Sequence, residues 1–302
     1  MALSAVSEPL RAANLLSGRP LYTWHLISPD GEPVPSSSGF SLLPEYSLES
    51  APVFDTLIVV ASLRVREQSD QRLLRWLRRA AQGQGYTRIG GVSTAAYLLA
   101  RAGLLENRRC TVHWEMLRDF QAEFPTLVVQ RALYVVDRDR MTCAGGTAAM
   151  DLMLALIAER HGKDLAAGIA DNFLHSRIRP GEESQRMLVQ WRYGISDARL
   201  AKAIAFMEQN MDQPLSPAAI ADIVCVSSRQ LERLFQKSFG QTPARFYLEL
   251  RLKHARYLLR QSTESIQQIS LRCGFASVSH FSRAYREAFA STPAQARAAA
   301  PD

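Results

Sequence analysis

The chain is predicted to fold as an α/β domain with a mainly parallel sheet, followed by an all-α domain that contains two helix-turn-helix units. Three observations predict this. Short β-rich runs alternate with helical stretches before about residue 180, almost everything after that point has helical period, and the helical part contains an internal repeat. A length of 302 residues, 47% of them hydrophobic and 22% charged, suits two ordinary domains and excludes a disordered or fibrous protein.

In the first part, strands and helices are expected in alternation. The expected strands are Leu21 to Ile27, Thr56 to Ala61 and Leu133 to Val136, and the expected helices include residues 73–81 and Met150 to Ala158. The charged stretch around Pro180 and Gly181 has no clear period. We therefore expect domains at residues 1–178 and 197–298, joined by a linker at residues 179–196.

The internal repeat lies in the helical part. Ile220 to Pro243 aligns with Ile269 to Pro293, and each copy reads as a short helix, a tight turn and a longer helix. Ser216, Ser227 and Ser277 stand where helix caps are needed. The longer helices are expected to bury apolar residues at helical spacing, namely Leu231, Leu234, Phe235 and Phe239 in the first copy and Phe281, Tyr285 and Phe289 in the second.

Between the copies, Thr242 and Pro243 begin a long helix that is expected to run through Gln261. Its stripe of Phe246, Leu250, His254 and Leu258 would hold the two units together, with His254 as a packed core residue rather than a ligand.

Net charge is +7, and the helical part carries most of it. Residues 196–302 contain 14 Lys and Arg against 9 Asp and Glu, whereas the rest contains 22 against 20. This excess fits contact with a nucleic acid, but charge alone allows a solvated basic surface equally well.

The outward faces of the two longer helices favour nucleic acid. Arginines at matching places in both copies, Arg233 and Arg283, would face outward, and an arginine fork can bind guanine in the major groove. The alternative is a helical bundle with a charged surface. Two copies with the same caps and the same aromatic spacing make that alternative the weaker one.

These residues resemble the DNA-binding domain of the AraC/XylS family of transcriptional regulators. The resemblance rests on VCVSSRQLERLFQKSFGQTPARFYLELRLKHARYLL and CGFASVSHFSRAYREAFASTP. It implies seven helices, with two recognition helices in successive major grooves. By matching positions it implies these base-reading residues: Ser228, Arg229, Glu232, Arg233, Val278, Ser279, Ser282 and Arg283.

The first part contains a candidate pocket. The run TRIGGVSTAAYLLA reads as a strand, a Gly-Gly turn and a helix, which would expose Ser93 at a sharp elbow above the sheet. TVHWE follows and places His113 where it could approach Ser93. MTCAGGTAAMD reads as a second strand, Gly turn and helix, whose free N–H groups could hold a carboxylate.

Together, in this order, these runs resemble the class I glutamine-amidotransferase-like (ThiJ/PfpI) domain, a flavodoxin-like fold that forms the sensor half of one AraC subgroup. Enzymes of this fold place a nucleophilic Cys at the elbow, whereas this chain has Ser93 there. No acid is identifiable as the partner of His113, which a serine nucleophile would require. A pocket that binds without reacting is therefore expected.

The resemblance is closest to regulators of arginine, glycine betaine and carnitine catabolism, which implies a small zwitterionic effector. The candidate ligand-binding residues are Glu8, Ser93, His113, Trp114 and Gly146. Trp114 could face a cationic head group, although ordinary core packing is the alternative. The turn at Gly145 and Gly146 could hold a carboxylate.

The predicted function is a ligand-responsive, DNA-binding transcription activator; the alternative is a ThiJ/PfpI-type amidase or protease fused to a DNA-binding domain. Expected partners are promoter DNA, RNA polymerase, a small-molecule effector and a second copy of the chain. The four cysteines stand singly and predict neither disulfides nor a metal site. No cofactor and no membrane span are expected, and the expected location is the cytoplasm.

The resemblance also implies a hydrophobic strand before the VSEPLR helix, inside the sheet. The sequence starts at Met1 essentially within that helix, so the first strand is expected to be missing. We therefore expect that Met1 is not the natural start and that a short apolar segment precedes it.

Overall fold

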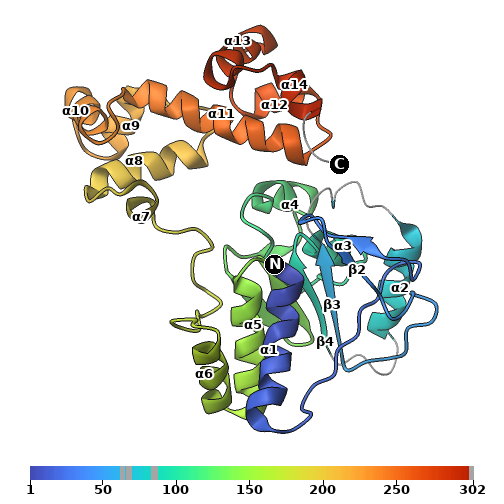
Figure 1. Ribbon diagram of the computed structural model, residues 1–302. Coiled ribbons are helices and arrows are strands. Elements are labelled where there is room, and N and C mark those ends of the chain that lie inside the picture. Colours follow the sequence, from blue (N-terminus) through green and yellow to red (C-terminus); the bar gives the residue numbers. More distant parts are fainter. Residues whose placement is uncertain (62–64, 66–69, 83–87, 299–302) are drawn as a thin grey trace. The chain divides into compact units, whose positions relative to one another are not determined.

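The computed structural model describes residues 1–61, 65, 70–82 and 88–298 (Figure 1). The chain divides into two compact units, Met1–Arg186 and Met187–Asp302. The first unit mixes helices with a sheet, and the described part of the second is helical. Each unit is considered below by itself.

A four-stranded sheet forms the centre of the first unit. Its order is β3 (Thr56–Ala61), β4 (Arg88–Ser93), β8 (Arg140–Cys143) and β7 (Tyr134–Asp137). The first three strands are parallel, and β7 pairs antiparallel with β8. Two small ladders accompany it, an antiparallel one between β1 (Val34–Pro35) and β2 (Ser41–Leu42) and a parallel one between β5 (Arg109–Cys110) and β6 (Val128–Val129).

Helices cover both faces of this sheet (Figure 1). On one face, Ile89 of β4 packs in a core with α2 (Gln71–Gln82), α3 (Ala96–Arg101) and α4 (Leu117–Glu123). On the other, Val92 packs in a core with α1 (Ala2–Ser17) and α5 (Ala148–His161), which α6 (Lys163–Asn172) extends. Side chains three positions apart on a strand point to opposite faces, so β4 contributes to both cores. This three-layer arrangement is the flavodoxin-like class that was predicted.

Two expectations about this unit are wrong. Leu21 to Ile27 forms no strand, apart from a single parallel bridge between Ile27 and Tyr46, because this segment has no neighbouring strand to pair with. Gly90 and Gly91 lie inside β4 and not in a turn. A Cβ on Gly91 would come within 2.9 Å of Leu99 Cδ1, so glycine there lets α3 pack closely on the strand. Thr87, where this strand was expected to begin, lies outside the described residues.

Other expected elements are confirmed. The strand at Thr56 to Ala61 is β3, the strand near Leu133 to Val136 is β7, and the helices at 73–81 and 150–158 are parts of α2 and α5. In the described part of the chain, no strand precedes α1 and β3 pairs with β4 alone. β3 is thus an edge strand of the described sheet.

The second unit contains α7 to α14. Their bounds are α7 (Val189–Tyr193), α8 (Ala198–Gln209), α9 (Pro217–Ile223), α10 (Ser228–Phe239), α11 (Pro243–Gln261), α12 (Ile266–Arg272), α13 (Val278–Phe289) and α14 (Pro293–Ala298). Helices α9 and α10 form the first helix-turn-helix, and α12 and α13 form the second. Helix α11 contributes Phe246 and Leu250 to the core of the first and Leu258 to the core of the second.

Three serine caps fix where these helices begin, as predicted. The hydroxyl of Ser216 accepts a hydrogen bond from the N–H of Ala219 at 3.1 Å, that of Ser227 from Gln230 at 3.2 Å and that of Ser277 from His280 at 3.2 Å. The Gln230 side chain returns the contact by accepting from the Ser227 N–H at 3.0 Å. These bonds satisfy N–H groups that the helix itself leaves unpaired.

The ends of α10 and α13 occupy equivalent places in the repeat but carry different residues. Gly240 ends α10 with φ 65°, and Ala290 ends α13 with φ 53°. Both are left-handed, a conformation that costs about 1–2 kcal/mol for a residue with a Cβ and little for glycine. The second helix-turn-helix therefore stores strain at Ala290 that the first helix-turn-helix does not have at Gly240.

We expect Ala290→Gly to raise the free energy of unfolding of the second unit by about 0.5–1 kcal/mol, and Gly240→Ala to lower it by about 1 kcal/mol. Urea unfolding of the full chain measures both. Ala288→Gly, within α13, is the control and should destabilise, because glycine there only weakens the helix. A loss of stability in Ala290→Gly as large as in the control would contradict the strain.

Candidate nucleic-acid interface and ligand pocket

The two recognition helices present the predicted base-reading residues to the outside. Leu231 and Phe235 of α10 and Phe281 and Tyr285 of α13 are buried, which turns the opposite faces outward. On these faces all the predicted residues except the half-buried Ser282 are exposed: Ser228, Arg229, Glu232, Arg233, Val278, Ser279 and Arg283.

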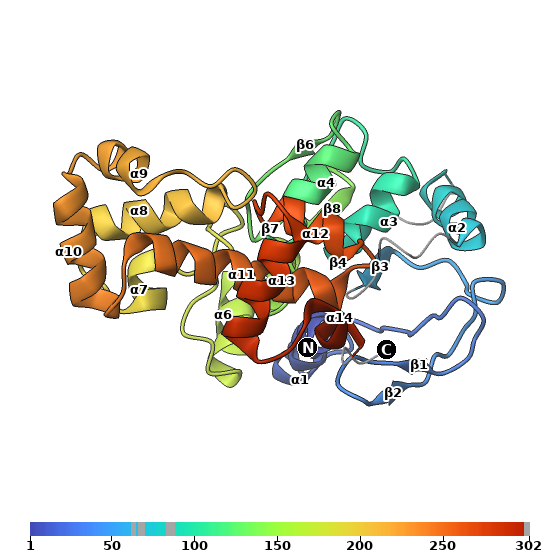
Figure 2. The same cartoon turned by 90° about the horizontal axis from the view of Figure 1, so that it is seen from above.

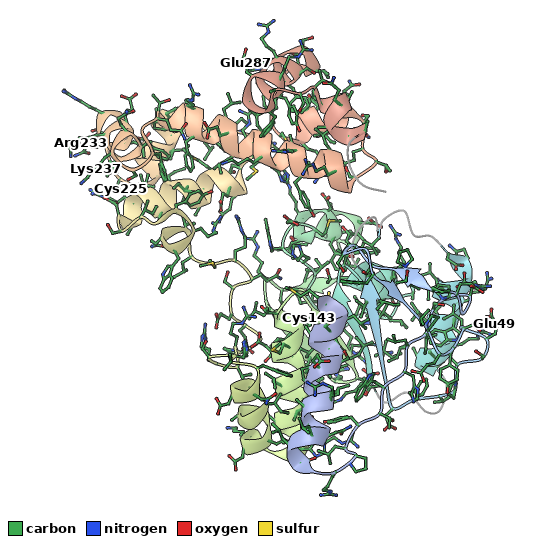
Figure 3. All side chains as sticks on the ribbon, in the orientation of Figure 1. Glu49, Cys143, Cys225, Arg233, Lys237 and Glu287 are labelled. Atoms are coloured by element: carbon green, nitrogen blue, oxygen red, sulfur yellow. The ribbon has the colours of Figure 1, made fainter. Side chains whose placement is uncertain are left out.

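The outer face of α10 also borders a hollow of about 460 Å³, which brings in residues that the sequence reasoning missed. Its lining consists of Arg229, Glu232, Arg233, Gln236, Lys237 and Thr242. Lys237 lies one helical turn after Arg233, and both extend from the same end of the unit (Figure 3). Within the described residues, no carboxylate forms an ion pair with Arg229, Arg233 or Lys237. These three cations are therefore available to DNA phosphates or bases.

Helix α11 separates the two recognition helices, which lie toward its opposite ends (Figure 2). With 19 residues it is about 28 Å long at 1.5 Å per residue. Arg251 fixes the second helix-turn-helix to α11 by donating to the carbonyl oxygens of Cys273 and Gly274 at 2.6 and 2.7 Å, with its guanidinium 4.3 Å from the Phe275 ring centre. Successive major grooves on one face of DNA are about 34 Å apart, so this spacer suits two-site reading.

In the first unit, the structure brings two parts of the predicted pocket together at the carboxyl ends of β4 and β8. Ser93 ends β4 with φ 65°, a strained conformation for serine that forms the expected elbow. A Cβ on Gly145 would come within 2.7 Å of Ser93 Cβ, so the glycine turn packs directly against the elbow. Gly146, beside it, faces open space. No acceptor in the described part of the chain takes the N–H groups of Gly146 and Thr147.

His113 has an acidic partner, contrary to expectation. Its Nδ1 lies 3.5 Å from the Glu115 carboxylate, two residues later in the chain. Burial lowers the pKa of His113, and the charge of Glu115 opposes this shift only in part. No hydrogen bond joins Ser93 to His113 among the described residues. The carboxylate thus lies near the histidine, and the structure does not pair the histidine with the serine.

Trp114 and Glu8 already have partners in the first unit. The guanidinium of Arg186 lies 4.3 Å from the centre of the Trp114 ring, and the His113 ring lies 5.7 Å from it. Trp114 is 39% exposed, so it is not an ordinary core residue. The Glu8 carboxylate accepts from Arg11 at 2.8 Å on the same helix. Val6, two residues earlier, packs in one core with Val92, next to Ser93.

A buried ion pair beside this pocket was missed by the sequence reasoning. Asp151, in the first turn of α5, is fully buried and accepts four hydrogen bonds: from His175 Nε2 at 2.8 Å, and from the N, Nε and Nη2 of Arg179 at 2.8, 2.9 and 2.6 Å. Nη2 of Arg179 also donates to the Thr147 hydroxyl at 2.7 Å. The start of α5, next to the glycine turn, is thereby tied to residues 175–179.

Residues 179–186, expected to belong to the linker, continue from this ion pair as a strap over the first unit. The Gly181 carbonyl accepts from the Leu133 N–H at 2.7 Å. Gln185 Nε2 donates to the Thr111 hydroxyl and to the carbonyls of Val112 and Ala132 at 3.1, 3.0 and 2.7 Å. Val112 precedes His113, so the strap ends beside the pocket residues.

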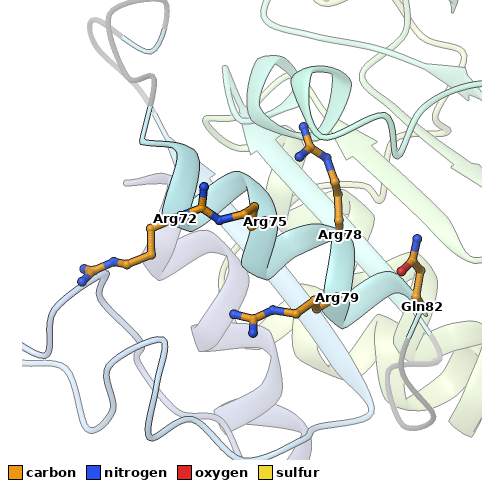
Figure 4. Close-up of a pocket in the computed structure, with 5 residues that line it drawn as sticks. All are labelled: Arg72, Arg75, Arg78, Arg79 and Gln82. Carbon is orange, nitrogen blue, oxygen red and sulfur yellow. The ribbon is translucent and has the colours of Figure 1, made fainter.

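The first unit has a hollow of about 370 Å³ on α2 (Figure 4). It is lined by arginines and one glutamine, namely Arg72, Arg75, Arg78, Arg79 and Gln82. Arg72 pairs with Glu49 at 3.5 Å, and Arg78 donates to two backbone carbonyls. It adds no side chain to the predicted pocket.

The described residues lack two kinds of feature. No helix among them is long and apolar enough to cross a membrane. They also contain no group of three or more His, Cys, Asp and Glu side chains that could hold a metal ion.

A helical unit with two helix-turn-helix motifs, joined to a flavodoxin-like unit, is the architecture of a class of transcription regulators. Residues 6–159 match the DJ-1/PfpI family, and residues 220–299 match a helix-turn-helix domain. The chain belongs to the family of HTH-type transcriptional regulators that combine a DJ-1/PfpI domain with an AraC-type DNA-binding domain.

Several members of that family are similar over nearly the whole chain. HTH-type transcriptional regulator CdhR of Pseudomonas aeruginosa is 46% identical over 99% of this chain and 88% of its own length. GbdR of the same species is 41% identical over 100% and 82%, and GlxA of Rhizobium meliloti is 39% identical over 98% and 91%. The crystal structure of an AraC family transcriptional regulator from Pseudomonas putida covers 57% of this chain and 91% of its own at 29% identity, with a TM-score of 0.52.

If Arg229 and Arg283 read bases, changing either to Ala should weaken binding to a selected operator by about 1–3 kcal/mol and hardly change binding to random DNA. Fluorescence anisotropy with both duplexes at one salt concentration measures this. Arg245→Ala is the matched control, because Arg245 is an exposed arginine of α11 that lies 3.7 Å from Glu249. Equal losses on operator and random DNA would assign both residues to phosphate contact.

Proposed function

We propose that this transcription regulator is an activator whose first unit binds a small zwitterionic metabolite of the amino acid, betaine or carnitine type without transforming it. The packing of the Gly145–Gly146 turn against Ser93 carries the proposal. It puts the Ser93 hydroxyl and the start of α5 beside the N–H groups of Gly146 and Thr147, for which the described residues supply no acceptor. That combination suits a carboxylate.

The other end of such a metabolite is a cation, and the first unit offers two groups for it. Trp114 presents a partly exposed ring, and Glu8 a carboxylate on the helix that packs beside Val92. Aromatic rings attract quaternary ammonium groups through their negative faces. In this proposal Gly146 and Ser93 bind the carboxylate, while Trp114, His113 and Glu8 surround the cationic head.

The wider partners follow from the family and not from contacts within the chain. We infer that the regulator acts at promoter DNA in the cytoplasm, contacts RNA polymerase and works as a homodimer. Two copies would double the number of recognition helices on a promoter, and so raise both affinity and the length of sequence that is read.

A hydrolase of the ThiJ/PfpI type is the second candidate, since the Ser93 elbow and the His113–Glu115 contact are both parts that a nucleophilic site uses. The missing hydrogen bond between Ser93 and His113 speaks against it. Cys143, two residues before Gly145, offers no alternative nucleophile. Burial raises the pKa of its thiol to about 12, so the reactive thiolate does not form near neutral pH. Binding without reaction is the better supported function.

A ligand that binds only the folded unit raises its melting temperature. We expect at least one of arginine, glycine betaine and carnitine, at about 100 times its Kd, to raise the melting temperature of the full chain by about 5–10 °C. Differential scanning fluorimetry measures this. Methyl esters of the same compounds, which lack the carboxylate, are the controls and should have little effect. An equal shift with acid and ester would rule out the carboxylate site.

Ser93→Ala separates the two candidate functions. If Ser93 only lines a pocket, the variant should require a higher ligand concentration for promoter activation, by about tenfold for one lost hydrogen bond to a charged group. Purified wild-type chain should hydrolyse neither amide nor peptide substrates. Turnover that Ser93→Ala abolishes would overturn the sensor proposal.

A further inference from the structure

Arg186 occupies the place that the proposed ligand's cationic head requires. Its guanidinium lies 4.3 Å from the centre of the Trp114 ring, within the distance of a favourable cation–π contact. Two cations repel one another and cannot share one ring face. A cationic ligand and Arg186 therefore compete for Trp114.

Arg186 is also the last residue of the first unit, since Met187 begins the second. The strap that ends in Arg186 is held firmly farther back, by the buried Asp151–Arg179 pair and by the three hydrogen bonds of Gln185. Its terminal residue thus lies between a rigid anchor and the connection to the DNA-binding unit. If Arg186 leaves Trp114, the mobile part of the segment that joins the two units becomes one residue longer.

We propose that Arg186 is an internal occupant of the ligand pocket, and that a cationic ligand activates the regulator by displacing it from Trp114 and so releasing the start of the connection to the second unit. This inference rests on the proposed function, because it requires the cationic head to bind at Trp114. It adds a residue from outside the predicted pocket and a physical route from ligand to DNA-binding unit.

The residues after Arg186 suit such a release. Met187 and Leu188 are 62 and 64% exposed. The helix that follows them is held, because Val189 and Tyr193 pack on the core of the second unit and Arg192 donates to Glu208. Freedom gained at residue 186 would therefore pass into residues 187 and 188 and end where α7 begins. The anchors at Arg179 and Gln185 keep the rest of the strap on the first unit.

The test uses the full chain and two variants that break the contact from opposite sides. Arg186→Met removes the cation but keeps an apolar stem, and Trp114→Leu removes the ring. Both should raise amide hydrogen exchange in peptides covering residues 184–192 of the ligand-free protein, and the increase in the double variant should be smaller than the sum of the two single increases. Arg177→Met is the matched control, because Arg177 pairs with Glu183 in the same region and has no contact with Trp114.

Ligand binding distinguishes the two variants. Arg186→Met should bind the cationic ligand about 2- to 30-fold more tightly than wild type, because the competing cation is gone, whereas Trp114→Leu should bind it less tightly. The probes are glycine betaine and tert-butylacetate, a carboxylate of the same shape in which a neutral carbon replaces the quaternary nitrogen. Only glycine betaine, with its cationic head, should raise exchange in residues 184–192 of the wild type.

The outcomes separate this inference from the proposed function. If no zwitterion stabilises the wild type, the proposed function fails; the exchange of ligand-free Arg186→Met still decides whether Trp114 holds the connection. Two results would contradict the proposal that Arg186 competes with the ligand for Trp114. One is unchanged hydrogen exchange in Arg186→Met, and the other is equal affinity of the variant and the wild type for glycine betaine.

Discussion

A single buried carboxylate, Asp151, fixes the geometry on which the first unit depends. A buried charge is costly unless it is paired, and losing one partner of such a pair typically costs about 3–5 kcal/mol. Asp151 meets this constraint with four donors from His175 and Arg179, residues that lie 24 and 28 positions later in the chain. It therefore holds the start of α5, the glycine turn beside Ser93 and the beginning of the strap in one rigid arrangement. The proposed ligand pocket and the proposed route from it to the second unit share this anchor.

The second unit depends on a different constraint, the sharing of one helix by two cores. Phe246 and Leu250 of α11 belong to the first core and Leu258 to the second. Neither helix-turn-helix buries its apolar face alone, since each uses part of α11. The spacing of the two recognition helices is thus set by the length of a continuous helix and not by a flexible connection. A fixed spacing is what reading two successive grooves requires.

The sequence predicted what is local and missed what is distant. The caps at Ser216, Ser227 and Ser277 are determined within a few residues, so they were correct. Of the apolar residues expected to be buried, Leu231, Phe235, Phe281 and Tyr285 are buried, whereas Leu234, Phe239 and Phe289 are only partly so. The Asp151–Arg179 pair and the Gln185 contacts join residues 28 to 74 positions apart and leave no periodic signal. For Leu21–Ile27 the sequence predicted a strand that does not form. The residues have high β propensity, but among the described residues no strand lies beside them to pair with. Glu115 was overlooked although it lies two residues from His113, since residue type alone does not show which carboxylate points at an imidazole.

The structure also shows which arginines are paired with carboxylates and which are not. The sequence alone could not separate a nucleic-acid surface from a solvated basic one. In the first unit most described arginines near the sheet pair with carboxylates, as in Arg88–Glu159, Arg101–Glu123, Arg108–Asp139 and Arg179–Asp151. On the outer faces of α10 and α13, by contrast, none of the described arginines Arg229, Arg233, Arg283 and Arg286 has such a partner. Unpaired cations repel one another and add nothing to folding, whereas a DNA backbone stabilises them by releasing its counterions. The positive charge on the outer faces of α10 and α13 is therefore available to DNA, whereas other arginines of both units, such as Arg192 beside Glu208, help to hold their own fold together.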